Sequence, residues 1–217
     1  MEAEVGRVRR ERRYQLRGGA SCLDFVNTVG WRLTDRPVEY LGSYEDLLAW
    51  ERQAGVLSSD EAGALSDGAA TDPEEARAVM SRTIALREAM HQVFSAGIAD
   101  GSLDEDAMSV FDRELSGALS RLRVVPAAGK AWAWDWDRGR DHGGPPLDLP
   151  LWPVARSAAE LLTSQKLGRV KVCAGEGCGW MFLDESRNGS RRWCDSRDCG
   201  NRERVRKYLA RRHASHP

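Results

Sequence analysis

Apolar residues recur at spacings of three and four along much of the chain, which is typical of amphipathic helices. These stripes predict helices over Ser43–Gly55, Thr71–Gly97, Ser102–Leu122 and Leu151–Lys166. Ser43 and Ser102 each begin a capping-box pattern, and Pro73 follows a Thr-Asp pair as the first residue of a helix. The body of the protein is therefore predicted to be mainly helical.

One stretch changes to a period of two. Arg123–Pro126 and Ala131–Asp137 flank a short turn, which predicts a β-hairpin. Three tryptophans, Trp132, Trp134 and Trp136, alternate with smaller residues and so share one face of the second strand. We expect this face to pack into the core, while stacking of Trp132 and Trp134 on a planar ligand or a base is the alternative.

The pattern changes again near Lys166–Gly168, where we place a domain boundary. The expected organisation is an N-terminal extension rich in Arg and Glu (1–14), an α-rich body with one β-hairpin (15–167) and a small C-terminal module (168–217). The fold class is α+β. Neither an export signal nor a membrane-spanning segment is predicted, so we expect a cytoplasmic protein.

Charge is divided unevenly between these parts. From Gln165 to Pro217 there are 13 Lys and Arg against 6 Asp and Glu, whereas the rest of the chain holds 19 against 27. A basic end on an acidic body is typical of a protein that binds a polyanion. The alternative is a solvated basic surface, or one that pairs with the acidic body.

Four of the five cysteines lie in this basic end, and only Cys22 lies upstream. The spacing of the four is Cys173-x4-Cys178, then 15 residues, then Cys194-x4-Cys199. Two matched pairs in a chain without an export signal favour a tetrahedral Zn²⁺ site over disulfides. Buried or redox-active thiols and an iron–sulfur cluster are the alternatives.

Four protein ligands leave no open position on the metal, so the zinc is expected to be structural. Residues 180–183 are predicted to pair with residues 191–193 across the Asp184–Ser190 turn. Removal of the metal is then expected to disorder the chain from Val172 onward and to leave the body folded. The module is predicted to be a treble-clef-like or ribbon-like hairpin followed by a helix.

The residues around the last two cysteines resemble a known family. Arg192-Trp193-Cys194 followed by Cys199-Gly200-Asn201-Arg202 is similar to the signature of the bacterial CGNR zinc finger. Leu23-Asp24-Phe25-Val26-Asn27-Thr28 resembles the start of the ABATE domain, which accompanies this finger in stress-induced transcription regulators. The resemblance spans about residues 15–213, and it implies zinc binding and DNA binding in a regulator.

The segment after Cys199 is predicted to be a helix capped by Asn201 or by the nearby Asp195 and Ser196. Val205, Tyr208 and Leu209 share one face, which we expect to pack on Trp180 and Phe182. Arg204, Lys207 and Arg211 share another face that can contact phosphates or base edges. The full set of candidate nucleic-acid contacts is Arg191, Arg192, Asn201, Arg202, Arg204, Arg206, Lys207 and Arg211. Asn201 and Arg202 have the alternative role of holding the chain against the metal site.

The body offers a candidate ligand site at Asp24 and Asn27, which are three residues apart in an apolar run. A carboxylate and an amide there could fix a polar effector, although such residues more often cap a neighbouring element. Cys22 is expected to be a small buried residue.

The sequence contains none of the common hydrolase, metalloprotease or phosphate-loop motifs, so we expect no enzyme activity. The hypothesis is a DNA-binding transcriptional regulator whose body acts as a sensor or a dimerisation domain. A homodimer is favoured because one small finger buries too little surface for tight DNA binding. The alternative is an interaction module whose basic helix docks an acidic protein partner.

Overall fold

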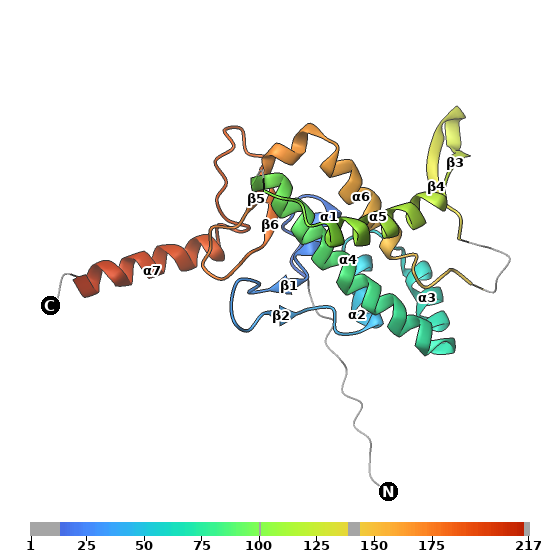
Figure 1. Ribbon diagram of the computed structural model, residues 1–217, viewed down its shortest axis with the longest axis horizontal. Coiled ribbons are helices and arrows are strands. Elements are labelled where there is room, and N and C mark those ends of the chain that lie inside the picture. Colours follow the sequence, from blue (N-terminus) through green and yellow to red (C-terminus); the bar gives the residue numbers. More distant parts are fainter. Residues whose placement is uncertain (1–13, 100, 139–143, 215–217) are drawn as a thin grey trace, which may run out of the picture.

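The computed structural model describes residues 14–99, 101–138 and 144–214. All but the last residue of the predicted N-terminal extension (1–14) therefore lies outside the described residues. The fold is α+β and mainly helical, as predicted (Figure 1). Its α-helices are α1 (Ser21–Val26), α2 (Tyr44–Gln53), α3 (Ser59–Thr71), α4 (Pro73–Ala99), α5 (Glu105–Ser120), α6 (Leu151–Leu162) and α7 (Cys199–Ala214). Its strands are β1 (Val29–Gly30), β2 (Val38–Glu39), β3 (Leu122–Pro126), β4 (Trp132–Trp136), β5 (Val170–Val172) and β6 (Met181–Leu183), with 3-10 turns η1 (Ala128–Lys130) and η2 (Gln165–Arg169). Among the described helices, none is long and apolar enough to cross a membrane.

Local capping fixes where the helices of the body begin. The Ser43 hydroxyl accepts a hydrogen bond from the Asp46 amide at the start of α2, as the sequence predicts. The start of α5 differs from the prediction, because Asp104 rather than Ser102 accepts hydrogen bonds from the first amides of the helix. A carboxylate at this end is favoured by the positive end of the helix dipole. Helix α3, with a capping box at Ser58, was not predicted.

The core of the body forms around α4, the longest helix, which packs against α1, α2, α3, α5 and α6. Phe25 of α1 and Trp50 of α2 are both fully buried, with ring centroids 5.5 Å apart. Arg87 of α4 is also buried, and its guanidinium forms a bidentate ion pair with Glu39 of β2 at 2.7 Å. This pair fixes the short β1–β2 hairpin to the central helix.

The β3–β4 hairpin forms as predicted, with Val124 opposite Trp134, but it stands away from the helices at one end of the molecule (Figure 1). Trp136 packs on Trp152 of α6 with ring centroids 5.8 Å apart. Trp132 and Trp134 are 70% and 58% exposed, so the prediction that all three indoles pack into the core is wrong for these two. The outer part of the hairpin, with Trp132 and Trp134, extends beyond the helices, and only its base at Trp136 packs on α6.

The C-terminal hairpin pairs β5 with β6, and Val172 lies opposite Met181. The predicted pairing of residues 180–183 with 191–193 is wrong, because 191–193 form no strand and β6 pairs with β5 instead. Met181 and Leu183 are buried in the main core of the body. The finger is therefore built on a strand that also belongs to the body.

Helix α7 extends from the rest of the molecule at the end opposite the β3–β4 hairpin (Figure 1). Val205, Tyr208 and Leu209 are exposed, so the predicted packing of this face on Trp180 and Phe182 is wrong. Those two aromatic rings have other partners. The Arg191 guanidinium covers Phe182 at 4.2 Å, and the Trp180 indole donates a hydrogen bond to the carbonyl of Val29.

Candidate metal centre

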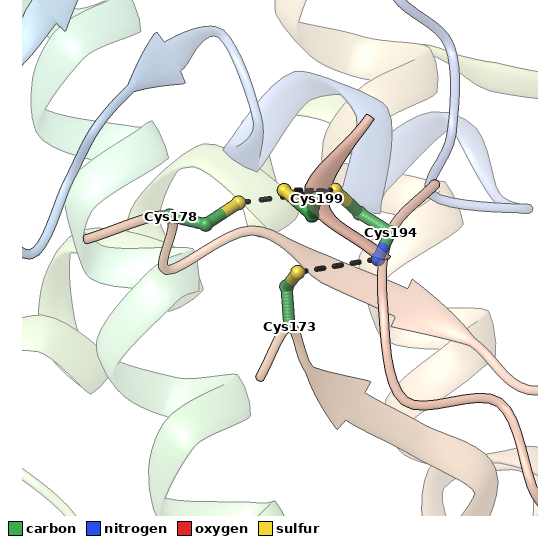
Figure 2. Close-up of side chains that lie close together, drawn as sticks. All are labelled: Cys173, Cys178, Cys194 and Cys199. Carbon is green, nitrogen blue, oxygen red and sulfur yellow. Dashed lines mark hydrogen bonds between the residues drawn. The ribbon is translucent and has the colours of Figure 1, made fainter. Parts of the chain in front are cut away.

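The four C-terminal cysteines meet at one buried point (Figure 2). Their sulfur atoms all lie within 4.8 Å of one another, and the Cys178–Cys194 and Cys194–Cys199 separations are 3.8 and 3.5 Å. A tetrahedron with metal–sulfur bonds of about 2.3 Å has edges of about 3.8 Å, whereas a disulfide requires about 2.05 Å. All four cysteines are free. They are positioned to bind a metal ion.

Two tight turns and one helix end carry the ligands. Cys173 follows β5 and Cys178 completes the first loop, while Cys199 is the first residue of α7. Gly177 has φ +72°, and a Cβ at this position would lie 2.6 Å from Thr34 of the body. A Cβ at Gly175 would lie 3.1 Å from the Cys199 sulfur. These glycines let the loop close around the sulfurs.

Hydrogen-bond donors lie around the sulfurs of Cys173 and Cys199. The Cys173 sulfur accepts hydrogen bonds from the Cys194 amide at 3.3 Å and from the Gly175 amide at 3.4 Å. Hydrogen bonds from the Cys178 and Cys194 thiols, together with these amides, lower the pKa of Cys173. The Arg202 guanidinium donates to the Cys199 sulfur at 2.9 Å. Such outer contacts hold ligands in place and balance thiolate charge.

A loop of the body lies directly over the metal centre. The amides of Arg32 and Leu33 donate hydrogen bonds of 3.2 Å to the carbonyls of Cys178 and Gly177. Trp31 takes a left-handed backbone conformation, φ +53°, which is rare for a bulky residue. Its ring lies 4.4 Å from the Arg202 guanidinium. This loop could not be predicted from the sequence, because no spacing relates residues 31–34 to cysteines about 150 positions away.

Asp24 and Asn27 both make hydrogen bonds to the backbone. The Asn27 side chain accepts from the Met181 amide and donates to the Met181 carbonyl, each at 2.8 Å, so it joins α1 to β6. Asp24 accepts from the Gly18 amide at 2.7 Å, and burial raises its pKa to about 6. A role in binding an effector stays a prediction for both. Cys22 is fully buried, as predicted, and burial raises its pKa to about 11.

The candidate nucleic-acid residues divide into internal and exposed groups. Arg191 is internal: its guanidinium donates to the carbonyls of Leu183, Arg17, Trp193 and Cys194. Arg202 donates a hydrogen bond to the Cys199 sulfur of the metal centre. Helix α7 begins at Cys199, so Asn201 lies inside its first turn and is not the residue that caps it; its side chain is exposed.

Asn201, Arg202 and the other candidates lie on the surface. Arg204 donates to the carbonyls of Gly200 and Ser196, and Arg206 pairs with Glu203 and Glu176. Lys207 lies 3.5 Å from Glu203. Arg192 and Arg211 are exposed, and the Arg192 guanidinium lies over the Trp193 ring.

Two protein families match this sequence. Residues 19–165 match the ABATE family, described as "putative stress-induced transcription regulator", and residues 169–212 match the CGNR zinc finger. No curated protein matches the chain. The chain therefore belongs to the ABATE family and carries a CGNR zinc finger after its ABATE domain.

Proposed function

We propose that this protein is a DNA-binding transcription regulator whose finger is held by a structural Zn²⁺. Four thiolates suit Zn²⁺, and with all four bound the ion has no open position for a substrate. The Cys199 ligand begins α7, so the metal would anchor the helix at its first residue. Zinc therefore supplies rigidity here and takes no part in a reaction.

The proposal is carried by one observation, the exposed cationic helix α7. The helix has six Lys and Arg residues and a single Glu over 16 residues. Nearly all of residues 201–212 are exposed, and only Glu203 is half-buried. A helix of this length is about 24 Å long and about 10–12 Å wide, and the major groove of B-DNA is about 12 Å wide. The helix therefore has the size and charge to enter that groove.

The ABATE body would then act as a sensor or a dimerisation domain. A single finger offers about 600–1,000 Å² of contact surface, which is too little for tight binding to one site. Two copies of the chain would present two helices to two half-sites. An effector bound to the body would change the spacing or the population of such dimers.

The salt dependence of DNA binding tests this function. Affinity for a random-sequence duplex is measured by fluorescence anisotropy between 50 and 300 mM salt. The triple variant Arg204→Ala, Lys207→Ala, Arg211→Ala should bind more weakly, and its log–log salt slope should fall by up to about 2.7, or about 0.9 for each lost phosphate contact.

The matched control removes three exposed basic residues from elsewhere, Arg77→Ala, Lys166→Ala and Arg187→Ala, and should keep the parent slope. A triple variant that binds DNA as tightly as the parent would remove α7 from the interface. If the parent chain binds no duplex even at 50 mM salt, the result would instead favour the alternative function, in which α7 docks to an acidic protein.

A further inference from the structure

A hollow of about 610 Å³ lies on the finger, beside the Cys194 ligand. One wall is the stretch 190–197, which contains the Cys194 ligand, and the other wall is formed by Leu16, Arg17 and Gly19 of the N-terminal segment. We propose that this arginine hollow binds a phosphodiester group of the DNA backbone, as a second contact beside α7. This inference rests on the proposed function and adds a binding site to it.

The charge of the hollow favours an anion. Four arginines line it, Arg17, Arg191, Arg192 and Arg197, against one acid, Asp195. The Asp195 side chain is buried and forms an ion pair with Arg17. Arg192 and Arg197 are exposed at the rim, and the Arg197 side chain is 86% exposed. Arginine binds phosphate oxygens through paired N–H groups, so these two residues are the proposed contacts.

Arg191 gives the hollow its fixed shape. Its guanidinium donates to the carbonyl of Arg17 at 3.0 Å on one wall and to the carbonyls of Trp193 and Cys194 on the other, at 3.0 and 2.5 Å. One side chain thus ties both walls together, and the Cys194 ligand fixes the second wall to the metal centre. A site that is rigid before binding loses less entropy when an anion arrives.

Neutral donors complete the site. Ser190 and Ser196 belong to the lining. The Trp193 indole N–H is buried and has no hydrogen-bond partner among the described residues. Because the hollow is open to solvent, a chain of nucleotides can pass along it with one phosphate inside.

The position of the hollow fits a duplex held by α7. The Ser196 carbonyl, in the wall of the hollow, accepts a hydrogen bond of 2.9 Å from Arg204 of the helix. The hollow therefore lies beside the first turns of α7. Phosphate contacts next to a recognition helix fix its register on the duplex and carry no sequence information.

The first test is the double variant Arg192→Gln, Arg197→Gln, compared with Lys166→Gln, Arg187→Gln. The control also removes two exposed positive charges, but neither residue lines the hollow. The double variant should bind duplex DNA roughly tenfold more weakly at 100 mM salt, and its salt slope should fall by about 0.9, because one phosphate contact is lost. The loss should be the same on unrelated sequences, and the control should match the parent.

The second test uses the indole N–H resonance of Trp193, assigned with Trp193→Phe. Three probes are added separately to the full chain: inorganic phosphate, the dinucleotide thymidylyl-(3′→5′)-thymidine and a duplex. The proposal expects the dinucleotide and the duplex to shift this resonance in the parent and not in the double variant. A shift with inorganic phosphate and none with the dinucleotide would make the hollow a free-anion site and overturn the proposal.

The outcomes separate this inference from the function on which it rests. If the duplex binds and the α7 triple variant weakens it, while the Arg192/Arg197 variant keeps the parent slope, the hollow is not a contact and the proposed function stands. If no duplex binds to the parent, the proposed function fails and the hollow fails with it.

Discussion

Glu51 of α2 is a carboxyl group buried without a partner. Its side chain is fully buried, and neither oxygen has a hydrogen-bond partner among the described residues. Burial raises its pKa well above the usual value of 4.5. Asp24 behaves in the same direction, because burial raises its pKa to about 6. Both groups bind protons more tightly in the folded state than in the unfolded chain.

This gives the stability of the protein a predictable pH dependence. For an acid whose folded pKa is raised, the unfolded chain releases its proton first, so stability falls as the pH rises above about 4.3, the ordinary carboxyl value. Glu51→Met removes the buried acid and should stabilise the protein by about 1–3 kcal/mol, more at pH 8 than at pH 5. Urea denaturation at intervals between these pH values measures the effect.

Glu185→Met, at an exposed position in the finger, is the control and should leave the pH dependence unchanged. A Glu51→Met variant whose stability changes with pH as steeply as that of the parent would show that this carboxyl does not titrate as its burial requires.

At the scale of single elements, the β3–β4 hairpin makes a clear contrast among its tryptophans. Trp136 packs on Trp152, whereas Trp132 and Trp134 are mostly exposed. Trp136→Ala should destabilise the protein by about 1–3 kcal/mol, below the range for a fully buried Trp. Trp132→Ala should change stability by less than about 0.5 kcal/mol.

Trp134 is intermediate, because its ring lies 5.2 Å from the Arg156 guanidinium, a contact of about 0.5–1 kcal/mol. Thermal unfolding of the three single variants gives the ranking. Equal losses at positions 132 and 136 would mean that the outer half of the hairpin is covered in solution.

The elements also show what a sequence can and cannot predict. Helix α2 was predicted at its start, because the Ser43 cap acts within one turn. The partner of β6 was predicted wrongly, because a three-residue apolar strand carries no information about which neighbour it pairs with. The spacing of Val205, Tyr208 and Leu209 predicted that these residues share one helix face. It could not predict that this face is exposed, because spacing carries no information about what packs on a face.

The metal ligands were the most predictable part of the site. The four ligands, Cys173, Cys178, Cys194 and Cys199, are close in sequence. A tetrahedral metal site needs four thiolates, and two close pairs of cysteines are the spacing that supplies them. Trp31 and Asn27 act on the same module from far away in the chain, and their roles needed the folded structure. The arginine hollow likewise depends on residues 16–19 meeting residues 190–197.

At the scale of the whole molecule, the structure predicts a different effect of metal removal than the sequence, which predicted that the body stays folded. Because β6 contributes Met181 and Leu183 to the core of the body, loss of the metal should loosen the body as well as the finger. A chelator should therefore lower the urea midpoint of the helical signal measured by far-UV circular dichroism, and Cys173→Ser should do the same.

Cys22→Ala is the control, because it removes a buried thiol outside the metal centre and keeps all four candidate ligands. Its midpoint should still fall when the chelator is added, whereas that of Cys173→Ser should respond little. If the chelator leaves the helical midpoint of the parent where it was, the body and the finger unfold independently.

The loop at residues 31–34 also bears on how such proteins recombine. The loop belongs to the ABATE segment, yet its amides bond the first cysteine turn and its Trp31 stacks on Arg202 of the finger. A chimaera that joins this body to the finger of another family member would place a foreign surface against Trp31. Such exchanges should succeed only when the loop travels with its finger.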